Sequence, residues 1–169
     1  FNIIKGLTFT SSNGVDYYNN TSYSFTPQSV NGAGKNSMGN SNLQRMLLQS
    51  SNNITYNHTW NDKHYLTVTG VWEATKSTIR NMGISGSSLQ AESVGWWDVK
   101  NAVTRDATNG YSDWALLSGV GRVIYNYDNR YMLTGTFRAD GSSRFTNDKW
   151  RYFPSVAVAW TASNESFME

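Results

Sequence analysis

Residues 131–160, YMLTGTFRADGSSRFTNDKWRYFPSVAVAW, carry the pattern that decides the fold. In residues 131–139 and 152–161, apolar side chains alternate with small or polar ones. Such alternation predicts β-strands, because successive side chains of a strand point to opposite faces of a sheet. The DGSS sequence between them predicts a tight turn, with Asp140 as a cap, Gly141 at positive φ and both serines bonding the local backbone.

The same alternation recurs along the chain and predicts further strands. They are expected at residues 2–10, 49–60, 66–75 and 117–127, with Lys5 as an exception on the apolar face of the first. The sequence therefore predicts an all-β chain, built as an antiparallel up-and-down meander of about six strands.

Short and long connections alternate strictly between the expected strands. The short ones are residues 61–63, 128–130 and 163–165, and the long ones are about 11–43, 79–113 and 140–151. In a meander this alternation gathers the short turns at one end and the long loops at the other. That arrangement is typical of outer-membrane barrels, with short periplasmic turns and long extracellular loops, and long structureless loops argue against a compact soluble domain.

The composition narrows the class of protein. Only 15% of residues are charged, 14% are aromatic, and Asn, Ser and Thr make up about a third of the chain. The absence of Cys excludes disulfides and thiolate sites, and a net charge of +2 without a basic cluster argues against nucleic acid. The sequence contains no run of about 18 apolar residues, so it predicts no transmembrane helix. A mean hydropathy of −0.53 remains compatible with strands that alternate between lipid and lumen.

Aromatic side chains cluster beside the short turns, where an interfacial girdle of a membrane barrel would lie. They are Trp60, Tyr65, Tyr125, Tyr127, Tyr131 and Trp160. Cross-strand aromatic pairs in a soluble sheet are the alternative. The N-terminal FNIIKGLTF lacks an initiator Met and signal-peptide features, so we interpret the chain as a piece of a longer or processed protein.

Residues 131–145, YMLTGTFRADGSSRF, resemble a signature of the SusC/RagA-type TonB-dependent outer-membrane transporters. Trp150, the FPSV sequence at 153–156 and Trp160 resemble its continuation, and residues 118–131 resemble the stretch before it. A looser similarity to a hairpin of the family extends back to Tyr56, with His64 and Gly70 at matching places.

The resemblance implies that residues 1–169 are a segment of a transmembrane β-barrel of about 22 strands with a plugged lumen. It also implies active import of large nutrients, usually oligosaccharides and sometimes peptides. The expected partners are a SusD/RagB-like surface lipoprotein, the TonB complex through plug and TonB-contacting regions absent from this chain, and the lipid of a Bacteroidetes-type Gram-negative outer membrane. It implies no enzymatic activity and no cofactor.

The long loops hold the expected ligand contacts. Aromatic side chains there can stack on sugar rings or clamp a peptide, and packing against other loops or a lid protein is the alternative. The candidates are Trp96, Trp97, Tyr111 and Trp114, with Tyr17, Tyr18, Tyr23 and Phe25 in the first loop.

The rim motif is the polar hairpin that follows the expected strand at 131–139. It comprises Arg138, Asp140, Gly141, Ser142, Ser143, Arg144 and Phe145. Ion pairs of both arginines with Asp140 are favoured over ligand binding. We expect Arg122, Arg138 and Glu73 to face the lumen and Leu133 and Val158 to face lipid.

Other motifs favour structural roles. His58 and His64 flank a turn without a third ligand at metal spacing, and Gly119-x-Gly121 lacks the pattern of a nucleotide loop. No residue pattern supports catalysis. Two alternatives stay open: a soluble, secreted glycan-binding β-sandwich whose Trp-rich loops form a sugar platform, and a barrel used for assembly or adhesion.

Overall fold

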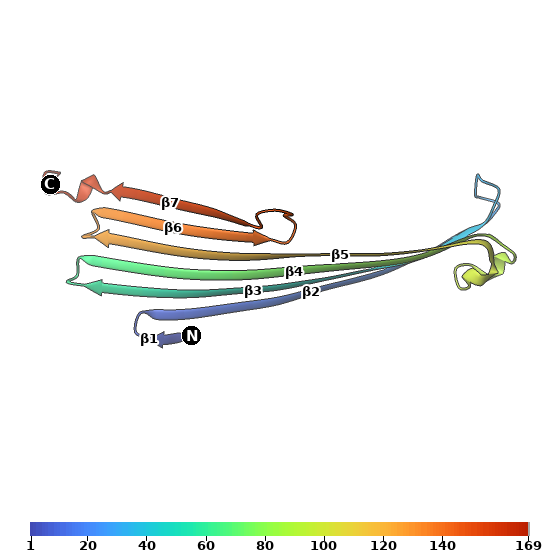
Figure 1. The fold of residues 1–169 in the computed structure, drawn as a ribbon, viewed down its shortest axis with the longest axis horizontal. Helices are drawn as coiled ribbons and strands as arrows, with labels where there is room; N and C mark the ends of the chain where they lie inside the picture. Colours follow the sequence, from blue (N-terminus) through green and yellow to red (C-terminus); the bar gives the residue numbers. More distant parts are fainter. Residues whose placement is uncertain (169) are drawn as a thin grey trace. The chain divides into compact units, whose positions relative to one another are not determined.

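The computed structural model describes residues 1–168. Within them, seven strands form one antiparallel sheet in chain order (Figure 1). They are β1 (Asn2–Ile4), β2 (Leu7–Thr26), β3 (Ser37–Trp60), β4 (His64–Leu89), β5 (Ala102–Tyr127), β6 (Tyr131–Ser142) and β7 (Trp150–Trp160). Short 3-10 helices are η1 (Glu92–Val94), η2 (Val99–Asn101) and η3 (Ala162–Asn164). The predicted all-β meander is confirmed.

The described part of the chain contains no helix that is long and apolar enough to cross a membrane.

The long connections are much shorter than the sequence predicts. Most residues expected in the loops at 11–43 and 79–113 lie in strands, so the connections are residues 27–36 and 90–101. The third expected loop, 140–151, shrinks to residues 143–149. The alternation of apolar and polar side chains is visible only where one face of a strand is apolar, so it misses strands that are polar on both faces. Such strands still form because pairing in a hairpin supplies hydrogen bonds to the backbone N–H and C=O groups, whatever the side chains are.

The first expected strand is broken at Lys5. Lys5 and Gly6 form a turn between β1 and β2, and Gly6 has a φ of 82°. The backbone of Asn57 donates a hydrogen bond to the Gly6 carbonyl at 2.7 Å, and a Cβ on Gly6 would collide with the Asn57 carbonyl. The charged residue on the apolar face therefore marks a tight turn rather than an exception within a strand.

The chain divides into two compact units, which we describe separately. Unit 1 comprises Phe1–Gly14, Leu48–Lys76 and Trp114–Glu169, and unit 2 comprises Val15–Leu47 and Ser77–Asp113.

In unit 1, the register of β5, β6 and β7 separates two faces. Leu133 pairs with Val158 and shares its face with Tyr125, whereas Arg122 pairs with Thr136 and Arg138 with Val120 on the other face. Val158 is 78% exposed. A contiguous apolar face with that exposure requires an apolar partner.

The two short hairpin turns form where the sequence predicts them. Asn61 and Asp62 connect β3 to β4 with φ of 52° and 53°, and Asp128 and Asn129 connect β5 to β6 with φ of 54° at both residues. Asn and Asp tolerate this left-handed conformation, which matches the twist of a hairpin. The third expected turn, 163–165, overlaps η3.

The predicted DGSS turn is wrong for Asp140 and Gly141, whereas Ser142 Oγ accepts a hydrogen bond from the nearby Arg144 N–H at 3.3 Å, as predicted. Strand β6 continues through Asp140 and Gly141 to Ser142, and Gly141 does not have positive φ. Gly141 is instead opposite Trp150, and a Cβ at this position would lie 3.1 Å from the indole ring. This glycine makes room for a cross-strand aromatic ring.

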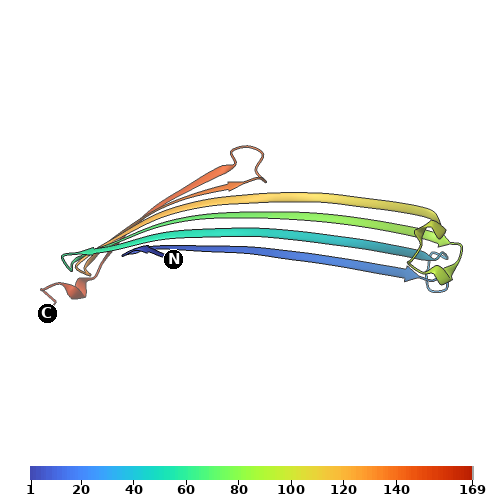
Figure 2. The ribbon, with the colours of Figure 1, turned by 90° about the horizontal axis from the view of Figure 1, so that it is seen from below.

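The small core of unit 2 lies where its two connections fold together. Met38, Leu89 and Ala102 are buried, and Phe25, Trp96 and Val99 pack against them. The connections 27–36 and 90–101 lie at the same end of the unit 2 strands in both views (Figures 1 and 2).

Candidate functional site

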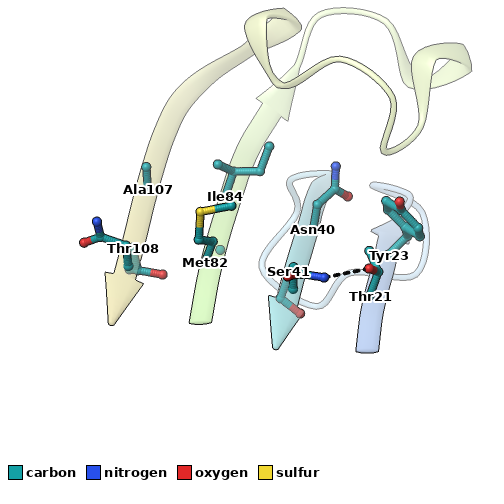
Figure 3. Close-up of a pocket in the computed structure, with 11 residues that line it drawn as sticks. Thr21, Tyr23, Asn40, Ser41, Met82, Ile84, Ala107 and Thr108 are labelled. Atoms are coloured by element: carbon teal, nitrogen blue, oxygen red, sulfur yellow. Dashed lines mark hydrogen bonds between the residues drawn. The ribbon is translucent and has the colours of Figure 1, made fainter. Parts of the chain in front are cut away.

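An open groove of about 550 Å³ crosses the strands of unit 2 (Figure 3). All four long strands, β2 to β5, contribute to it. We call it the amide groove and define it by Tyr23, Asn40, Asn42, Met82, Ile84 and Asn109.

Hydrogen bonds fix which side chains share the face of the amide groove. The Asn42 amide donates to Asn19 Oδ1 at 2.7 Å and to Thr21 Oγ1 at 2.9 Å, so these three residues lie on one face. Tyr23 and Asn40 are two positions away from Thr21 and Asn42 along their strands and therefore project from the same face. Met82 and Ile84 form the apolar part of the groove (Figure 3).

Three aromatic rings meet at one end of the groove. Tyr23 lies 6.4 Å from both Trp96 and Trp97 between ring centroids, and the two indoles are 5.9 Å apart. Asn40 Nδ2 donates to the Trp96 carbonyl at 3.0 Å, which holds the 90–101 connection against this face. Trp97 remains 78% exposed, whereas Trp96 is half-buried.

A polar clasp joins the two connections of unit 2. The buried Asn36 side chain accepts a hydrogen bond from the Leu89 N–H and donates to the Leu89 carbonyl at 3.1 Å. It also donates to Glu92 Oε1 at 3.2 Å, and the same oxygen accepts from the Gln28 N–H at 2.7 Å. The Asn36 side-chain amide thus exchanges two hydrogen bonds with the Leu89 backbone, as the backbone of a neighbouring strand would.

A second hollow adjoins Asn42, Met82 and Asn109. Arg80 lies over the ring of Tyr111 there, 5.9 Å from its centroid, and Tyr111 is 62% exposed.

The rim motif in unit 1 combines an ion pair with backbone bonds. Arg138 Nε donates to Asp140 Oδ2 at 2.7 Å, as the sequence predicts. Ser143 extends the pairing with β5, since its N–H donates to the Ala115 carbonyl at 2.9 Å and its Oγ accepts from the Ala115 N–H at 2.8 Å.

Arg144 takes a different place from the one predicted. Its guanidinium lies 4.9 Å from the centroid of the Trp114 ring, a cation–π arrangement, rather than in the pair with Asp140. Phe145 lies beneath Arg151, 5.7 Å away. The Arg144 guanidinium and Trp114 therefore shield each other, which leaves less of the indole free for a ligand.

Aromatic rings are stacked beside the hairpin turns of unit 1. Trp60 and His64 are parallel within 3° at 5.0 Å, and Tyr127 and Tyr131 are 6.4 Å apart. The hydrogen bond of 2.7 Å between His64 Nδ1 and the Tyr125 hydroxyl gives His64 a structural partner. Among residues 1–168, no three His, Asp or Glu side chains are grouped as a metal site would require.

Glu165 ties the segment after β7 to the β5–β6 turn. Its carboxylate accepts from the Tyr131 hydroxyl at 2.6 Å, from Trp160 Nε1 at 3.1 Å and from Arg130 at 3.3 Å. The Tyr131 hydrogen bond, with smaller contributions from Trp160 and Arg130, lowers the pKa of the Glu165 carboxyl. The carboxylate is therefore stabilised in its charged form.

Of the residues that define the amide groove, the sequence predicts only Tyr23 as a ligand candidate. Trp96, Trp97 and Tyr23 are among the expected loop aromatics, and the structure brings these three together. The amides and the Met82–Ile84 pair escape the sequence pattern because it predicts loops for their segments. Their spacing of two residues, as in Asn40-x-Asn42 and Met82-x-Ile84, is the signal that indicates a shared strand face.

Three known proteins are similar in sequence to this chain over most or part of its length. "TonB-dependent receptor P39" and "TonB-dependent receptor P3" of Formosa agariphila are 33% and 30% identical over 99% and 100% of the chain. "TonB-dependent receptor SusC" of Bacteroides thetaiotaomicron is 47% identical over 32% of the chain. The chain spans only 16% and 17% of the lengths of the first two.

Solved structures share the fold. The structure of "the RagAB peptide transporter" matches 98% of the chain with a TM-score of 0.83 at 22% identity, and the chain covers 19% of it. The "closed-closed" state of the RagAB peptide importer matches with a TM-score of 0.84. No protein-family model matches the chain.

The chain belongs to the family of TonB-dependent receptors. Its strands have the fold of the matching segment of the solved structures. Within that class, the resemblance to the SusC/RagA type that residues 131–160 predict is confirmed.

Proposed function

We propose that this chain forms part of the barrel wall of a receptor that imports large nutrients across the outer membrane with energy from TonB. The ligand is an oligosaccharide or a peptide, captured with a SusD/RagB-like surface lipoprotein. TonB and the plug act through regions outside this chain.

The observation that carries the proposal is similarity to TonB-dependent receptors along 99% of the chain. The apolar face of β5, β6 and β7 supports it, because Leu133 and Val158 are 49% and 78% exposed. Side chains of this kind project to lipid in a transmembrane barrel, while the opposite face, with Arg122 and Arg138, suits a water-filled lumen.

A soluble glycan-binding sandwich is disfavoured by the topology. A sandwich buries its core between two sheets, whereas the strands within residues 1–168 form one sheet. Val156 and Val158, both more than 75% exposed, would face water in such a protein.

Trp96 and Trp97 in the connection 90–101, and Tyr111 and Trp114 in strand β5, are our candidates for ligand contact. Trp97 and Tyr111 are 78% and 62% exposed and suit stacking on a sugar ring or a peptide side chain. Trp96 and Trp114 are half-buried and engaged with other side chains, so we assign them supporting positions next to these contacts.

The test uses the full-length receptor in its own cells. Strains with and without the receptor gene, and with and without TonB, are given fluorescent oligosaccharides and fluorescent peptides, and uptake is compared. We expect the receptor in the outer-membrane fraction and uptake of one ligand class that requires both receptor and TonB. Receptor-dependent binding that persists without TonB, with no uptake, would instead indicate the adhesion alternative.

A soluble receptor that fractionates away from the outer membrane would refute the proposal.

A further inference from the structure

The second hollow of unit 2 contains an arginine that has no acidic partner. The hollow has a volume of about 400 Å³. We call it the arginine hollow and define it by Gln44, Arg80, Asn109 and Tyr111. Arg80 is exposed and forms no ion pair among residues 1–168, whereas Arg45 of the same unit pairs with Asp16 at 3.7 Å. The positive charge of Arg80 is therefore available to an anion from outside this chain.

The ring of Tyr111 positions the Arg80 guanidinium. The guanidinium lies 5.9 Å from the ring centroid in a cation–π arrangement. A guanidinium stacked on a ring keeps the N–H groups at its edge available, and their planar fork matches the oxygens of a phosphate or a carboxylate. The amides of Gln44 and Asn109 line the same hollow and can bond to hydroxyl groups. The hollow thus combines one positioned cation with neutral hydrogen-bonding groups.

The arginine hollow lies on the face of the strands that we propose to meet lipid. Tyr111 and Tyr125 are an even number of residues apart in β5, so their side chains project from the same face. The same holds for Arg80 and His64 in β4, and His64 is hydrogen-bonded to the Tyr125 hydroxyl at 2.7 Å. Tyr125 pairs with Leu133 on this face. The hollow therefore opens away from the lumen.

Strands β4 and β5 are longer than a membrane requires. A membrane-spanning strand needs about 9–11 residues, whereas β4 and β5 have 26 residues each. The aromatic side chains beside the short turns, such as Trp60 and Tyr127, suit the periplasmic interface of the membrane. More than half of each strand then extends beyond the hydrocarbon on the outer side, and this part includes Arg80 and Tyr111.

Acidic sugars are the chemistry that a cation meets at this level of an outer membrane. The outer leaflet of such a membrane consists of glycolipids whose sugars carry phosphate and carboxylate groups. Cationic side chains next to a membrane surface attract anionic headgroups. The charge of Arg80 and the continuity of its face with the apolar face of unit 1 both favour this partner.

We propose that the arginine hollow binds an acidic headgroup sugar of an outer-leaflet glycolipid. Arg80 pairs with its phosphate or carboxylate, and Gln44 and Asn109 bond to its hydroxyls. The inference rests on the proposed function for the face that meets lipid, and it needs no plug, lipoprotein or TonB. Tyr111, which is also a candidate for nutrient contact, here supports Arg80 beside the glycolipid.

The experiment measures lipid binding to the purified full-length receptor in detergent. The fluorescent probes are lipid A with its acidic inner-core sugars, phosphatidylglycerol as an anionic lipid without sugars, and digalactosyldiacylglycerol as a neutral glycolipid. Fluorescence anisotropy gives Kd for the parent, Arg80→Gln and Arg80→Lys. Arg45→Gln is the matched control, because Arg45 is an exposed arginine of unit 2 that directly follows Gln44 in β3 and so projects from the opposite face.

We expect the acidic glycolipid to bind the parent most tightly. Arg80→Gln should weaken this binding about threefold to tenfold, because a charge-assisted hydrogen bond at an exposed site is lost. Arg80→Lys keeps the charge without the planar fork and should give an intermediate Kd. Asp113→Asn removes an exposed carboxylate from the same face of β5 as Tyr111 and should strengthen binding about twofold. Arg45→Gln should leave Kd within about 1.5-fold of the parent.

Salt gives a second readout of the Arg80 charge. Binding of the acidic glycolipid to the parent should weaken severalfold between about 0.05 and 0.5 M salt, because screening acts on charged pairs. The same change should be smaller in Arg80→Gln. Arg80 is exposed, so its variants are expected to fold.

Acidic glycolipid binding unaffected by Arg80→Gln, or equally tight binding of the neutral glycolipid, would overturn the inference. An equal dependence on Arg80 for phosphatidylglycerol would contradict the assignment to a sugar headgroup. Native mass spectrometry of the same samples counts receptor copies, and fewer copies in Arg80→Gln with unchanged lipid binding would assign the hollow to a protein interface instead. A receptor that fractionates with the outer membrane and imports its nutrient, yet lacks Arg80-dependent lipid binding, refutes this inference and leaves the proposed function standing.

Discussion

Replacement of Asn36 by Asp tests whether the polar clasp holds the two connections of unit 2 together. The change removes two donor hydrogens and keeps the size of the side chain. The carboxylate can still accept from the Leu89 N–H, but it loses the bonds to the Leu89 carbonyl at 3.1 Å and to Glu92 Oε1 at 3.2 Å.

The size of the effect follows from burial. Asn36 is 4% exposed and Leu89 is 6% exposed. A buried carbonyl left without a donor costs about 1–3 kcal/mol, and loss of a hydrogen bond to a charged group costs about 1.5–3 kcal/mol. Repulsion between the new carboxylate and Glu92 adds to both. We expect local opening of the clasp to become easier by about 3 kcal/mol, which is roughly a hundredfold change in its equilibrium constant.

Hydrogen exchange of the full-length receptor in detergent measures this opening directly. Peptides that cover residues 86–92 report the Leu89 amide, and exchange through local opening follows the opening equilibrium. We expect their protection to fall about a hundredfold in Asn36→Asp. Asn20→Asp, the same substitution at an exposed position, should change local protection less than about threefold.

Acidic conditions supply a second readout. Once protonated, the carboxyl group introduced by Asn36→Asp regains one donor, so part of the protection should return as the pH falls toward the pKa of that carboxyl. Protection in Asn36→Asp within about threefold of the parent at neutral pH would refute the energetic role of the clasp.

Three further predictions concern unit 1, and two of them have a matched control substitution. Val158→Arg places a charge on the face that we propose to meet lipid and should destabilise folding into bilayers by about 2–4 kcal/mol, measured by urea titration, whereas Ala157→Arg on the opposite face should cost less. Equal costs for the two would contradict the assigned faces. Gly141→Val should cost about 1–3 kcal/mol because its side chain meets the indole ring 3.1 Å away, and Gly135→Val, where the space is open, should be tolerated in the same titration. Because its pKa is lowered in the folded state, Glu165 stabilises the segment after β7 above the ordinary carboxyl range, and this contribution is lost as the pH falls through its folded pKa. Protection of residues 162–168 in hydrogen exchange should therefore fall on acidification, and in Glu165→Gln the protection should be lower at neutral pH and nearly independent of pH.

The alternation of side chains determined the parts of the fold in which one face is apolar. Residues 131–139 and 152–160 form strands with the predicted faces, and the Asn and Asp residues at 61–62 and 128–129 form the predicted turns. These features are local: a strand needs only its own period, and a left-handed turn needs only residues that tolerate positive φ.

The tertiary structure decided the features that depend on residues far apart in the sequence. Polar segments such as residues 15–26 and 102–113 become strands because neighbouring strands complete their backbone hydrogen bonds. The residues within these segments do not indicate which strand will pair with them. The sequence predicts a turn at Gly141 because glycine favours turns, whereas the role of this residue depends on Trp150, nine residues away. The amide groove also draws its residues from four strands. Chemistry of the kind that Tyr23, Asn40, Met82 and Asn109 offer together exists only once pairing brings these strands side by side.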